Sequence, residues 1–394
     1  MLAPTKLALS GERFHVTYQI VGARDEVMRK AEEICIEQTV EFPADLVPDD
    51  DIRAHVFGRI ESVEQRAERL FHVQISYAIE TAGLEITQLL NVVFGNTSMK
   101  PDIQVADLAL PASLLAAYAG PRFGISGLRE LLGVTGRPLL CTAIKPMGLS
   151  AAALVQMTGD FARGGIDLIK DDHGLADQVF APYAERVKRC AEAVQEANQR
   201  TGRRSVYAPN VTAPGRALWE RAYLAKQAGA GAFLVAPGIV GYDRMQALAD
   251  DPQLGLPILF HPALLGSFVT YPYTGMAHGV VFGLLGRLAG ADVTIFPNFG
   301  GRFSFSREDC LAIAEAARRP LGQLKPIFPA PAGGMSIGRV ADMVALYGVD
   351  TVLLIGGDLH RHPDGVYAAS QRFLETVLAA CAQRLGVEQG AQRL

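Results

Sequence analysis

The stretch from Gly165 to Gln178, GIDLIKDDHGLADQ, decides how the larger part of the chain is expected to fold. Its mainly apolar run, Ile166–Ile169, is followed directly by a lysine, two aspartates and a histidine, Lys170–His173. Burying a charge costs free energy unless another group pairs with it. The stretch is therefore either a strand end that opens into solvent or a functional site.

The same kind of short apolar run recurs from Arg137 onward, with helical patterns such as LWERAYLAKQAGA between the runs. The eight runs are PLLCTAIK, IDLIK, SVYAPN, AFLVAP, LPILFH, DVTIFP, KPIFPAP and DTVLLIGG. Eight strands that alternate with helices are typical of a (β/α)₈ TIM barrel, whose active site lies at the carboxyl ends of the strands. These ends carry Lys145, Lys170–His173, Asn210, Pro237, His261, the Pro297–Arg302 loop, Ala332–Gly334 and Gly356–Gly357.

The first 120 residues predict a small α+β domain of ferredoxin-like type. FHVTYQIVG, AHVFGRIESVEQ and RLFHVQISYAIE have the alternation of strands. DEVMRKAEEICIEQTV has helical spacing with Asp25 as a possible cap, and ITQLLNVVFGN predicts a helix or a strand. GPRFGISGLRELLGV marks the change of domain, so we expect domains over residues 1–120 and 121–394.

Composition excludes several classes of function. The 394 residues carry a net charge of −4, which gives no reason to expect binding to nucleic acid or an anionic membrane. No apolar run is long enough to span a membrane, and the N-terminus does not resemble a signal peptide. Five scattered cysteines without a CxxC pair favour reduced thiols and a cytoplasmic protein.

Two lysines and two carboxylates are expected to meet at the mouth of the barrel. There, Lys145 or Lys170 can form a Schiff base, exchange protons, or add CO₂ to give a carbamate. A carbamate beside Asp172 would be a hard oxygen site for Mg²⁺, whereas the alternative is a structural Lys–Asp pair. His173 and His261 are candidate ligands or acid–base groups, although a lone histidine most often has no such role.

Glycine pairs follow the seventh and eighth predicted strands. Backbone N–H groups of Gly333, Gly334, Gly356 and Gly357 can cradle a phosphate, and barrels often bind phosphate at these two strand ends. The alternative is a pair of tight turns, for which glycine is the usual residue. The presence of two pairs at neighbouring strands favours a phosphorylated small-molecule substrate.

Several of these motifs resemble the large subunit of ribulose-bisphosphate carboxylase. GGIDLIKDDHG is similar to the GGLDFxKDDE motif of that family, and TAIKPMGLS is similar to TxIKPxxGLS at the first barrel strand. ADVTIFPNFGGRF, PAPAGGMS and LLIGGDLHRHPDG resemble the sixth, seventh and eighth strand ends, and NVVFGNTS resembles a segment of the N-terminal domain. The similarity covers nearly the whole chain in order.

The resemblance implies roles for the residues that match. Lys170 would be carbamylated by CO₂ and would bind Mg²⁺ together with Asp172. His173 stands where the family has a glutamate ligand, and because imidazole suits other divalent metals better, Mn²⁺ or another metal is an alternative. Lys145 would transfer protons at the substrate carbon. The remaining implied contacts are those of Asn210 and His261 with substrate hydroxyls or the metal, and of the four glycines with phosphate.

Departures from the motifs indicate a RuBisCO-like protein that does not carboxylate. The CO₂-holding lysine of the sixth-strand loop falls at or near Arg302, the serine before the seventh-strand glycines is Ala332, and Met147 or a gap replaces a second lysine. Glu37 and Asn96 match residues that a partner subunit contributes, so a homodimer is implied.

Members of this family stabilise an enolate formed beside a metal-polarised carbonyl. The KDDHG variant most resembles branches that act on 3-oxo-isoapionate 4-phosphate, so C–C bond cleavage of that β-keto acid, by hydrolysis or decarboxylation, is the leading prediction. The alternative is the 2,3-diketo-5-methylthiopentyl-1-phosphate enolase of methionine salvage, and another branch isomerises 5-methylthioribulose 1-phosphate. Two hypotheses from other functional classes remain: a Schiff-base aldolase, and a non-catalytic barrel that binds a sugar phosphate or a partner protein.

Overall fold

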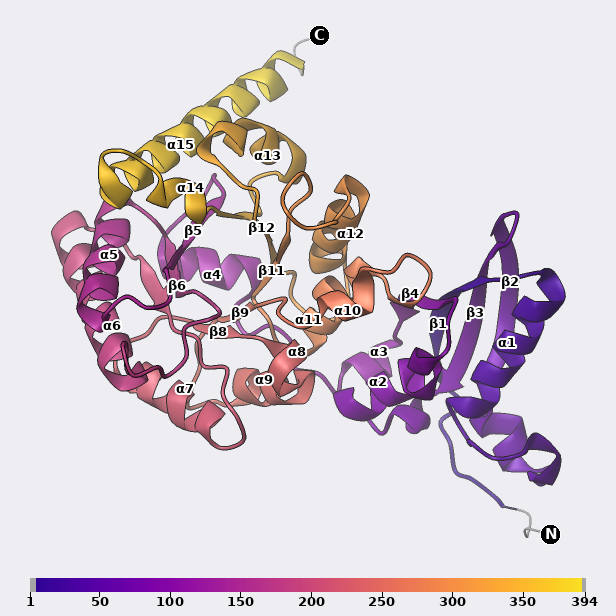
Figure 1. The fold of residues 1–394 in the computed structure, drawn as a ribbon. Coiled ribbons are helices and arrows are strands. Elements are labelled where there is room, and N and C mark those ends of the chain that lie inside the picture. Colours follow the sequence, from indigo (N-terminus) through magenta and orange to yellow (C-terminus); the bar gives the residue numbers. More distant parts are fainter. Residues whose placement is uncertain (1–4, 392–394) are drawn as a thin grey trace. The chain divides into compact units, whose positions relative to one another are not determined.

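The computed structural model describes residues 5–391, which divide into two compact units (Figure 1). The first unit comprises the chain up to Ala119 together with Leu265–Leu285 and Gly322–Leu324. The second comprises Gly120–Leu264, Gly286–Leu321 and the chain from Lys325 onward. Within the described residues, none of the helices combines the length and the apolar character needed to cross a membrane.

The first unit is built on a five-stranded sheet in the order β10-β4-β1-β3-β2. On β1, every second residue is buried, as the alternating sequence predicts. β1 pairs antiparallel with both β3 and β4, while β10 adds to β4 in parallel. The strands are β1 (Arg13–Val21), β2 (Arg59–Ala67), β3 (Leu70–Ala78), β4 (Ile103–Ala109) and β10 (Gly275–Met276).

Helices and shorter helical turns complete the first unit. The α-helices are α1 (Arg24–Glu37), α2 (Ile86–Phe94), α3 (Ala112–Leu115) and α10 (Gly266–Val269). Turns of 3₁₀-helix cover Ala44–Leu46, Ile79–Ala82 and Asn96–Met99, and π-helical segments cover Ile52–Val56 and Gly279–Leu284.

Two local predictions for this unit need correction. The residue that caps α1 is Ala23, whose N–H reaches the Glu26 carboxylate at 3.4 Å, so Asp25 lies inside the first turn. The strand predicted from Ala54 begins only at Arg59. Arg13 of β1 donates to the His55 carbonyl in the preceding π-helical turn and to the Phe57 carbonyl just after it, which holds this segment against the sheet.

The second unit is a closed barrel of eight parallel strands, which confirms the predicted fold class (Figure 1). The strand order is β7-β6-β5-β13-β12-β11-β9-β8, and a bridge between Asn210 and Leu234 joins the two end strands. The strands are β5 (Leu139–Ile144), β6 (Leu168–Asp171), β7 (Val206–Ala208), β8 (Phe233–Val235), β9 (Ile258–Phe260), β11 (Val293–Pro297), β12 (Phe328–Ala332) and β13 (Val352–Leu354).

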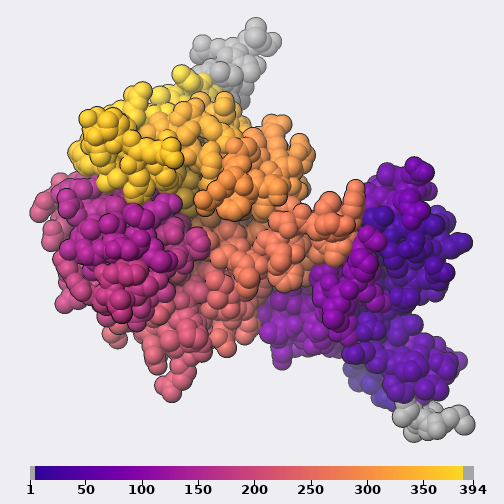
Figure 2. All heavy atoms as spheres, in the orientation of Figure 1, coloured from indigo at the N-terminus to yellow at the C-terminus, as the bar shows by residue number. Residues whose placement is uncertain are grey.

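Helices cover the outside of the barrel. α15 packs against α5, and Figure 2 shows their yellow and magenta surfaces side by side. The helices are α4 (Gly124–Leu132), α5 (Ala151–Gly164), α6 (Tyr183–Thr201), α7 (Ala217–Gln227), α8 (Pro237–Val240), α9 (Tyr242–Asp250), α12 (Arg307–Arg318), α13 (Val340–Tyr347), α14 (Gly357–His360) and α15 (Gly365–Ala391), with a 3₁₀ turn at Ile337–Arg339. α11 (Leu285–Leu288) follows the second π-helical segment.

The amino end of the barrel is filled by apolar side chains. Leu128 and Leu132 of α4 belong to the same buried cluster as strand residues such as Leu139 and Leu168. Burying a leucine side chain contributes roughly 1.5–3 kcal/mol. This end is also tied by the carboxylate of Asp292, which accepts three backbone N–H groups. The carboxyl end of the strands is therefore where polar groups can gather.

Candidate active site

Lys170 is a deeply buried lysine of the predicted site. It lies in β6, pairs in register with Ala143 of β5, and is only 3% exposed. Burial lowers the pKa of its amine, and Nζ donates to the backbone carbonyl of Asp171 at 3.1 Å. A lysine in such a position holds a larger share of neutral, nucleophilic amine than one on the surface.

Asp172 is the carboxylate that faces the same region. Its Oδ1 lies 3.9 Å from Nζ of Lys145, and its Oδ2 lies 3.6 Å from Nδ1 of His173. The Asp172 N–H donates to Ile144 at the end of β5, which keeps the neighbouring strand ends together. The structure thus brings the predicted Lys145, Lys170, Asp172 and His173 into one cluster.

Asp171 points away from this cluster and has a different role. Its carboxylate accepts hydrogen bonds from the Tyr207 hydroxyl at 2.6 Å, from Nη2 of Arg186 at 3.2 Å, and from the Asn210 N–H at 3.0 Å. Both partners of the Asp171–Arg186 ion pair are fully buried. Of the two adjacent aspartates, Asp172 is therefore the one available to a ligand.

His173 and His261 stack on each other. Their ring centroids are 4.5 Å apart and the planes differ by 16°. Burial lowers the pKa of both imidazoles, most strongly for His261, where the charge of Lys170 adds to the effect. The Ala263 N–H donates to Nδ1 of His261 at 3.2 Å, so the neutral His261 ring carries its proton on Nε2 and presents a donor there.

The side chain of Asn210 is bonded to the backbone of the loop that follows β6. Its amide nitrogen donates to the carbonyls of His173 and Leu175, each at 3.0 Å, and its oxygen accepts the Thr212 N–H. Contact of Asn210 with substrate stays a prediction. The observed bonds place it as a support for the loop that carries Asp172 and His173.

The glycine pair after β12 has both residues in the left-handed region, with φ of 72° at Gly333 and 67° at Gly334. A Cβ on Gly334 would lie 2.5 Å from the Cα of Gly301, so the loops after β11 and β12 touch through their backbones. Arg339 reinforces this contact by donating to the carbonyls of Phe299 and Gly334. No motif in the sequence pointed to Arg339.

The glycine pair after β13 lies beside Lys145. A Cβ on Gly356 would be 3.1 Å from Nζ of Lys145, whereas one on Gly357 would meet no atom within 4 Å. Arg302, on the loop after β11, lies over the ring of Phe303 at 5.0 Å from its centroid. Its charge contributes to the lowered pKa of His173, which puts Arg302 within electrostatic reach of the cluster.

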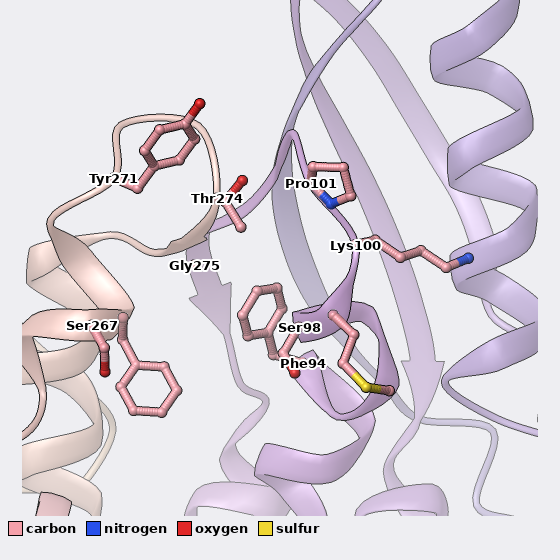
Figure 3. Close-up of a pocket in the computed structure, with 10 residues that line it drawn as sticks. Phe94, Ser98, Lys100, Pro101, Ser267, Tyr271, Thr274 and Gly275 are labelled. Atoms are coloured by element: carbon pink, nitrogen blue, oxygen red, sulfur yellow. The ribbon is translucent and has the colours of Figure 1, made fainter.

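Glu37 and Asn96, the residues predicted to serve a partner subunit, are hydrogen-bonded to each other in the first unit at 2.9 Å. Next to the Asn96 segment lies a hollow of about 470 Å³, drawn in Figure 3. Phe94, Phe268 and Tyr271 contribute to its lining, all from the first unit. None of the predicted site residues lines this hollow.

The described residues contain no group of three His, Cys, Asp or Glu side chains arranged to hold a metal ion. Asp172 and His173 supply two donors of types that divalent cations accept. The buried amine of Lys170 lies within electrostatic reach of Asp172 and is a candidate for a further donor. The donor set therefore fits a divalent metal if Lys170 is converted into an oxygen ligand.

Fold and site together define a TIM-barrel protein with a lysine–aspartate centre at the carboxyl end of the second barrel strand. The profile of the family "Ribulose bisphosphate carboxylase large chain, catalytic domain" matches residues 124–303. The ribulose bisphosphate carboxylase-like protein 1 of Rhodopseudomonas palustris is 43% identical over 88% of this chain and 93% of its own length. The chain belongs to the ribulose bisphosphate carboxylase large-chain family, among its RuBisCO-like proteins.

Two further relatives have names that state an activity. The 5-methylthioribulose-1-phosphate isomerase of Rhodospirillum rubrum is 39% identical over 95% of this chain and 99% of its own length. A 2,3-diketo-5-methylthiopentyl-1-phosphate enolase from Exiguobacterium sibiricum is 34% identical over 93% of this chain and 92% of its length. The crystal structure of a Rubisco-like protein from Rhodopseudomonas palustris superposes with a TM-score of 0.84, at 41% identity over 93% of this chain and 97% of that one.

Proposed function

We propose that the chain is a metal-dependent enzyme that removes a proton beside the carbonyl of a phosphorylated keto substrate and does not fix CO₂. The observation that carries this proposal is the cluster at the ends of β5 and β6. There the buried Lys170 amine, the Asp172 carboxylate and the Lys145 amine lie together, with Lys145 Nζ 3.9 Å from Asp172.

The metal would be held by Asp172, His173 and a carbamate formed by CO₂ on Lys170. A neutral amine is the form that adds CO₂, and burial of Lys170 favours that form. When bound, a divalent cation polarises a substrate carbonyl and lowers the cost of the negative charge that develops on its oxygen. Mg²⁺ is the expected ion, and the imidazole of His173 favours Mn²⁺ or a similar metal as the alternative.

The other residues of the cluster would handle protons and charge. Lys145 would exchange a proton with the substrate carbon; its amine lies near both Asp172 and Gly356. His261 carries its proton on Nε2 and would donate a hydrogen bond to a substrate oxygen. The resemblance puts the CO₂-holding lysine of a carboxylase at or near Arg302, and an arginine there is consistent with chemistry without carboxylation.

Phosphate would bind at the glycine pairs after β12 and β13, and Gly356 of the second pair lies close to the amine of Lys145. Backbone N–H groups of Gly333, Gly334, Gly356 and Gly357 are the proposed donors. We further propose a homodimer in which Glu37 and Asn96 of one subunit complete the site of the other. Their hydrogen bond to each other supports a joint role.

Two exposed apolar side chains on loops at the carboxyl end of the barrel suggest what kind of substrate fits. Met147 is 52% exposed and its methyl carbon lies against Gly174, next to Asp172. Phe303 is 47% exposed and its ring lies against Gly333. A substrate with an apolar group as well as a phosphate fits these side chains, and the names of the two relatives that state an activity both contain a methylthio group.

We therefore place enolisation of 2,3-diketo-5-methylthiopentyl 1-phosphate, or isomerisation of 5-methylthioribulose 1-phosphate, ahead of the C–C cleavage predicted first from the KDDHG motif. The names of the relatives support these two reactions and give no support to cleavage of 3-oxo-isoapionate 4-phosphate. C–C cleavage stays the second candidate function. His173, the histidine of the KDDHG motif that suggested it, lies beside Asp172 and stacks on His261.

The test is a ³¹P and ¹³C NMR assay of the purified protein with Mg²⁺ and bicarbonate against the three phosphates in parallel. Conversion of either methylthio compound without loss of carbon is the expected result. Release of CO₂ or a two-carbon acid from the isoapionate compound alone would move the protein to the cleavage branch. A borohydride-trapped adduct with full activity in EDTA would replace the proposal by a Schiff-base aldolase.

A further inference from the structure

The loop that carries the proposed ligands, residues 172–181 between β6 and α6, contains little regular structure. A loop of this kind normally varies in position unless its backbone groups find partners elsewhere. Here four consecutive carbonyls are each taken by a side chain. His173 and Leu175 accept from Asn210, Gly174 accepts from Gln178, and Ala176 accepts from Arg186.

Arg186 reaches this loop from inside the protein. It lies on the buried stripe of α6 with Tyr183, Val187 and Cys190, and its side chain is fully buried. Its Nη1 donates to the Ala181 carbonyl at 2.6 Å, and its Nη2 donates to the Ala176 carbonyl at 2.8 Å. The planar guanidinium therefore fixes both the middle and the end of the loop.

Asp171 connects the two supports of the loop. One carboxylate oxygen accepts from both Arg186 and the Asn210 N–H, and the other accepts from Tyr207. Arg186 and Asn210 thus each donate hydrogen bonds to carbonyls of the loop, and each donates another to the Asp171 carboxylate, which holds both residues in place. Removing one partner of such a buried pair would leave an uncompensated charge, which is strongly unfavourable.

We propose that Arg186 and Asn210, held by Asp171, are positioning residues that preset Asp172 and His173 for a divalent cation before the cation arrives. The proposal rests on the proposed function, because it needs the site to bind a metal. Residues that orient metal ligands without touching the metal change affinity by about 10–100-fold when they are replaced. Neither Arg186 nor Asn210 needs to touch the metal or the substrate for this effect.

The chain offers a matched pair of variants. Asn210→Ala removes both bonds to the loop carbonyls of His173 and Leu175. Tyr207→Phe removes a buried hydrogen bond to the same Asp171 carboxylate but none to the loop. If the network only stabilises the fold, the two variants behave alike, whereas positioning predicts that only Asn210→Ala disturbs the ligands. Gln178→Ala loses the part-buried bonds to the Gly174 carbonyl and the Ala176 N–H but keeps Asn210 and Arg186, and it is the second variant if Asn210→Ala fails to fold.

The first measurement is hydrogen–deuterium exchange of the metal-free full-length protein. We expect faster exchange in residues 172–181 for Asn210→Ala and Gln178→Ala, with Tyr207→Phe unchanged in that segment. The second is Mn²⁺ affinity by electron paramagnetic resonance with bicarbonate present. We expect about a 10–100-fold weaker Mn²⁺ affinity for Asn210→Ala and a smaller loss for Gln178→Ala, with Tyr207→Phe near the parent value.

The outcomes separate the two proposals. Unchanged loop exchange in Asn210→Ala, or in Gln178→Ala if the former does not fold, would overturn the positioning role whatever the metal does. Equal loss of Mn²⁺ affinity in Asn210→Ala and Tyr207→Phe would also overturn it, since a general effect on stability would then suffice. A parent protein that binds no Mn²⁺, with the predicted exchange pattern intact, would instead contradict the proposed function and leave the loop support standing.

Discussion

Alanine substitutions at Gly333 and Gly334 are expected to differ although the two residues are adjacent. Both have a left-handed backbone, with φ of 72° and 67°, so alanine is strained at either position. The new methyl group at 333 would lie 3.7 Å from the ring of Phe303, an ordinary contact. At 334 it would lie 2.5 Å from the Cα of Gly301 and 3.1 Å from its nitrogen, and backbone cannot turn aside as a side chain can.

The magnitudes follow from these contacts. A left-handed conformation costs an L-residue about 1–2 kcal/mol, and that cost applies to both variants. Forcing extra volume into a packed contact costs roughly 1–3 kcal/mol more, and that cost applies to Gly334→Ala alone. Gly334→Ala should also shift the loop that carries Arg302, and a displacement near 1 Å can lower kcat/KM by on the order of 10²-fold.

The assay is urea unfolding of the two variants side by side, followed by kcat/KM with the phosphorylated substrate identified for the parent. We expect Gly334→Ala to be the less stable by roughly 1–3 kcal/mol and to have the lower kcat/KM. Equal stabilities would refute the reasoning, because they would show that the loops after β11 and β12 separate without cost.

Three further predictions concern the barrel end. Gly356→Ala should lower kcat because its methyl group would lie 3.1 Å from the Lys145 amine. A methyl group at 357 would meet no protein atom within 4 Å, so Gly357→Ala should change kcat less and act mainly on KM, since Gly357 is a proposed phosphate donor. Equal kcat values would contradict the position of Lys145 beside Gly356. Burial and then Lys170 hold the pKa of His261 well below 6.5, so an unfolded chain takes up a proton below pH 6.5 that the folded one does not. His261 therefore contributes stability that is present above pH 6.5 and is lost as pH falls, by up to about 1.4 kcal/mol per pH unit. In urea titrations of the metal-free proteins, the free energy of unfolding of His261→Gln should fall less steeply with decreasing pH than that of the parent. His173→Glu should raise the ratio of Mg²⁺ to Mn²⁺ affinity measured by calorimetry, because a carboxylate suits Mg²⁺ better than imidazole does; an unchanged ratio would argue that His173 is not a ligand.

The eight barrel strands could be predicted because each is a short apolar run followed by polar or glycine residues. The position of the site followed from the same pattern, since the carboxyl ends of parallel strands meet at one end of a barrel. The sequence also put Lys145, Lys170, Asp172 and His173 at these ends, and the structure brings all four together.

Contacts between distant segments could not be predicted in the same way. Arg186 has the sequence context of an ordinary helical arginine, and its only signal is its position on the apolar stripe of α6. The stacking of His173 on His261 joins two segments far apart in the chain. The glycines at 334 and 301 could be recognised as turns, but their contact depends on how two loops pack, which neither local sequence determines.

The measurement that tests the account most directly is solvent-deuterium exchange into 2,3-diketo-5-methylthiopentyl 1-phosphate, followed by ¹H NMR in D₂O. The protein is freed of metal and CO₂, and Mg²⁺ and bicarbonate are then added separately and together. The account predicts rapid exchange only when both are present, and none above background in Lys170→Met, whose side chain cannot form a carbamate. Full exchange in the metal-free, CO₂-free protein, or in Lys170→Met, would contradict the central role given to this site.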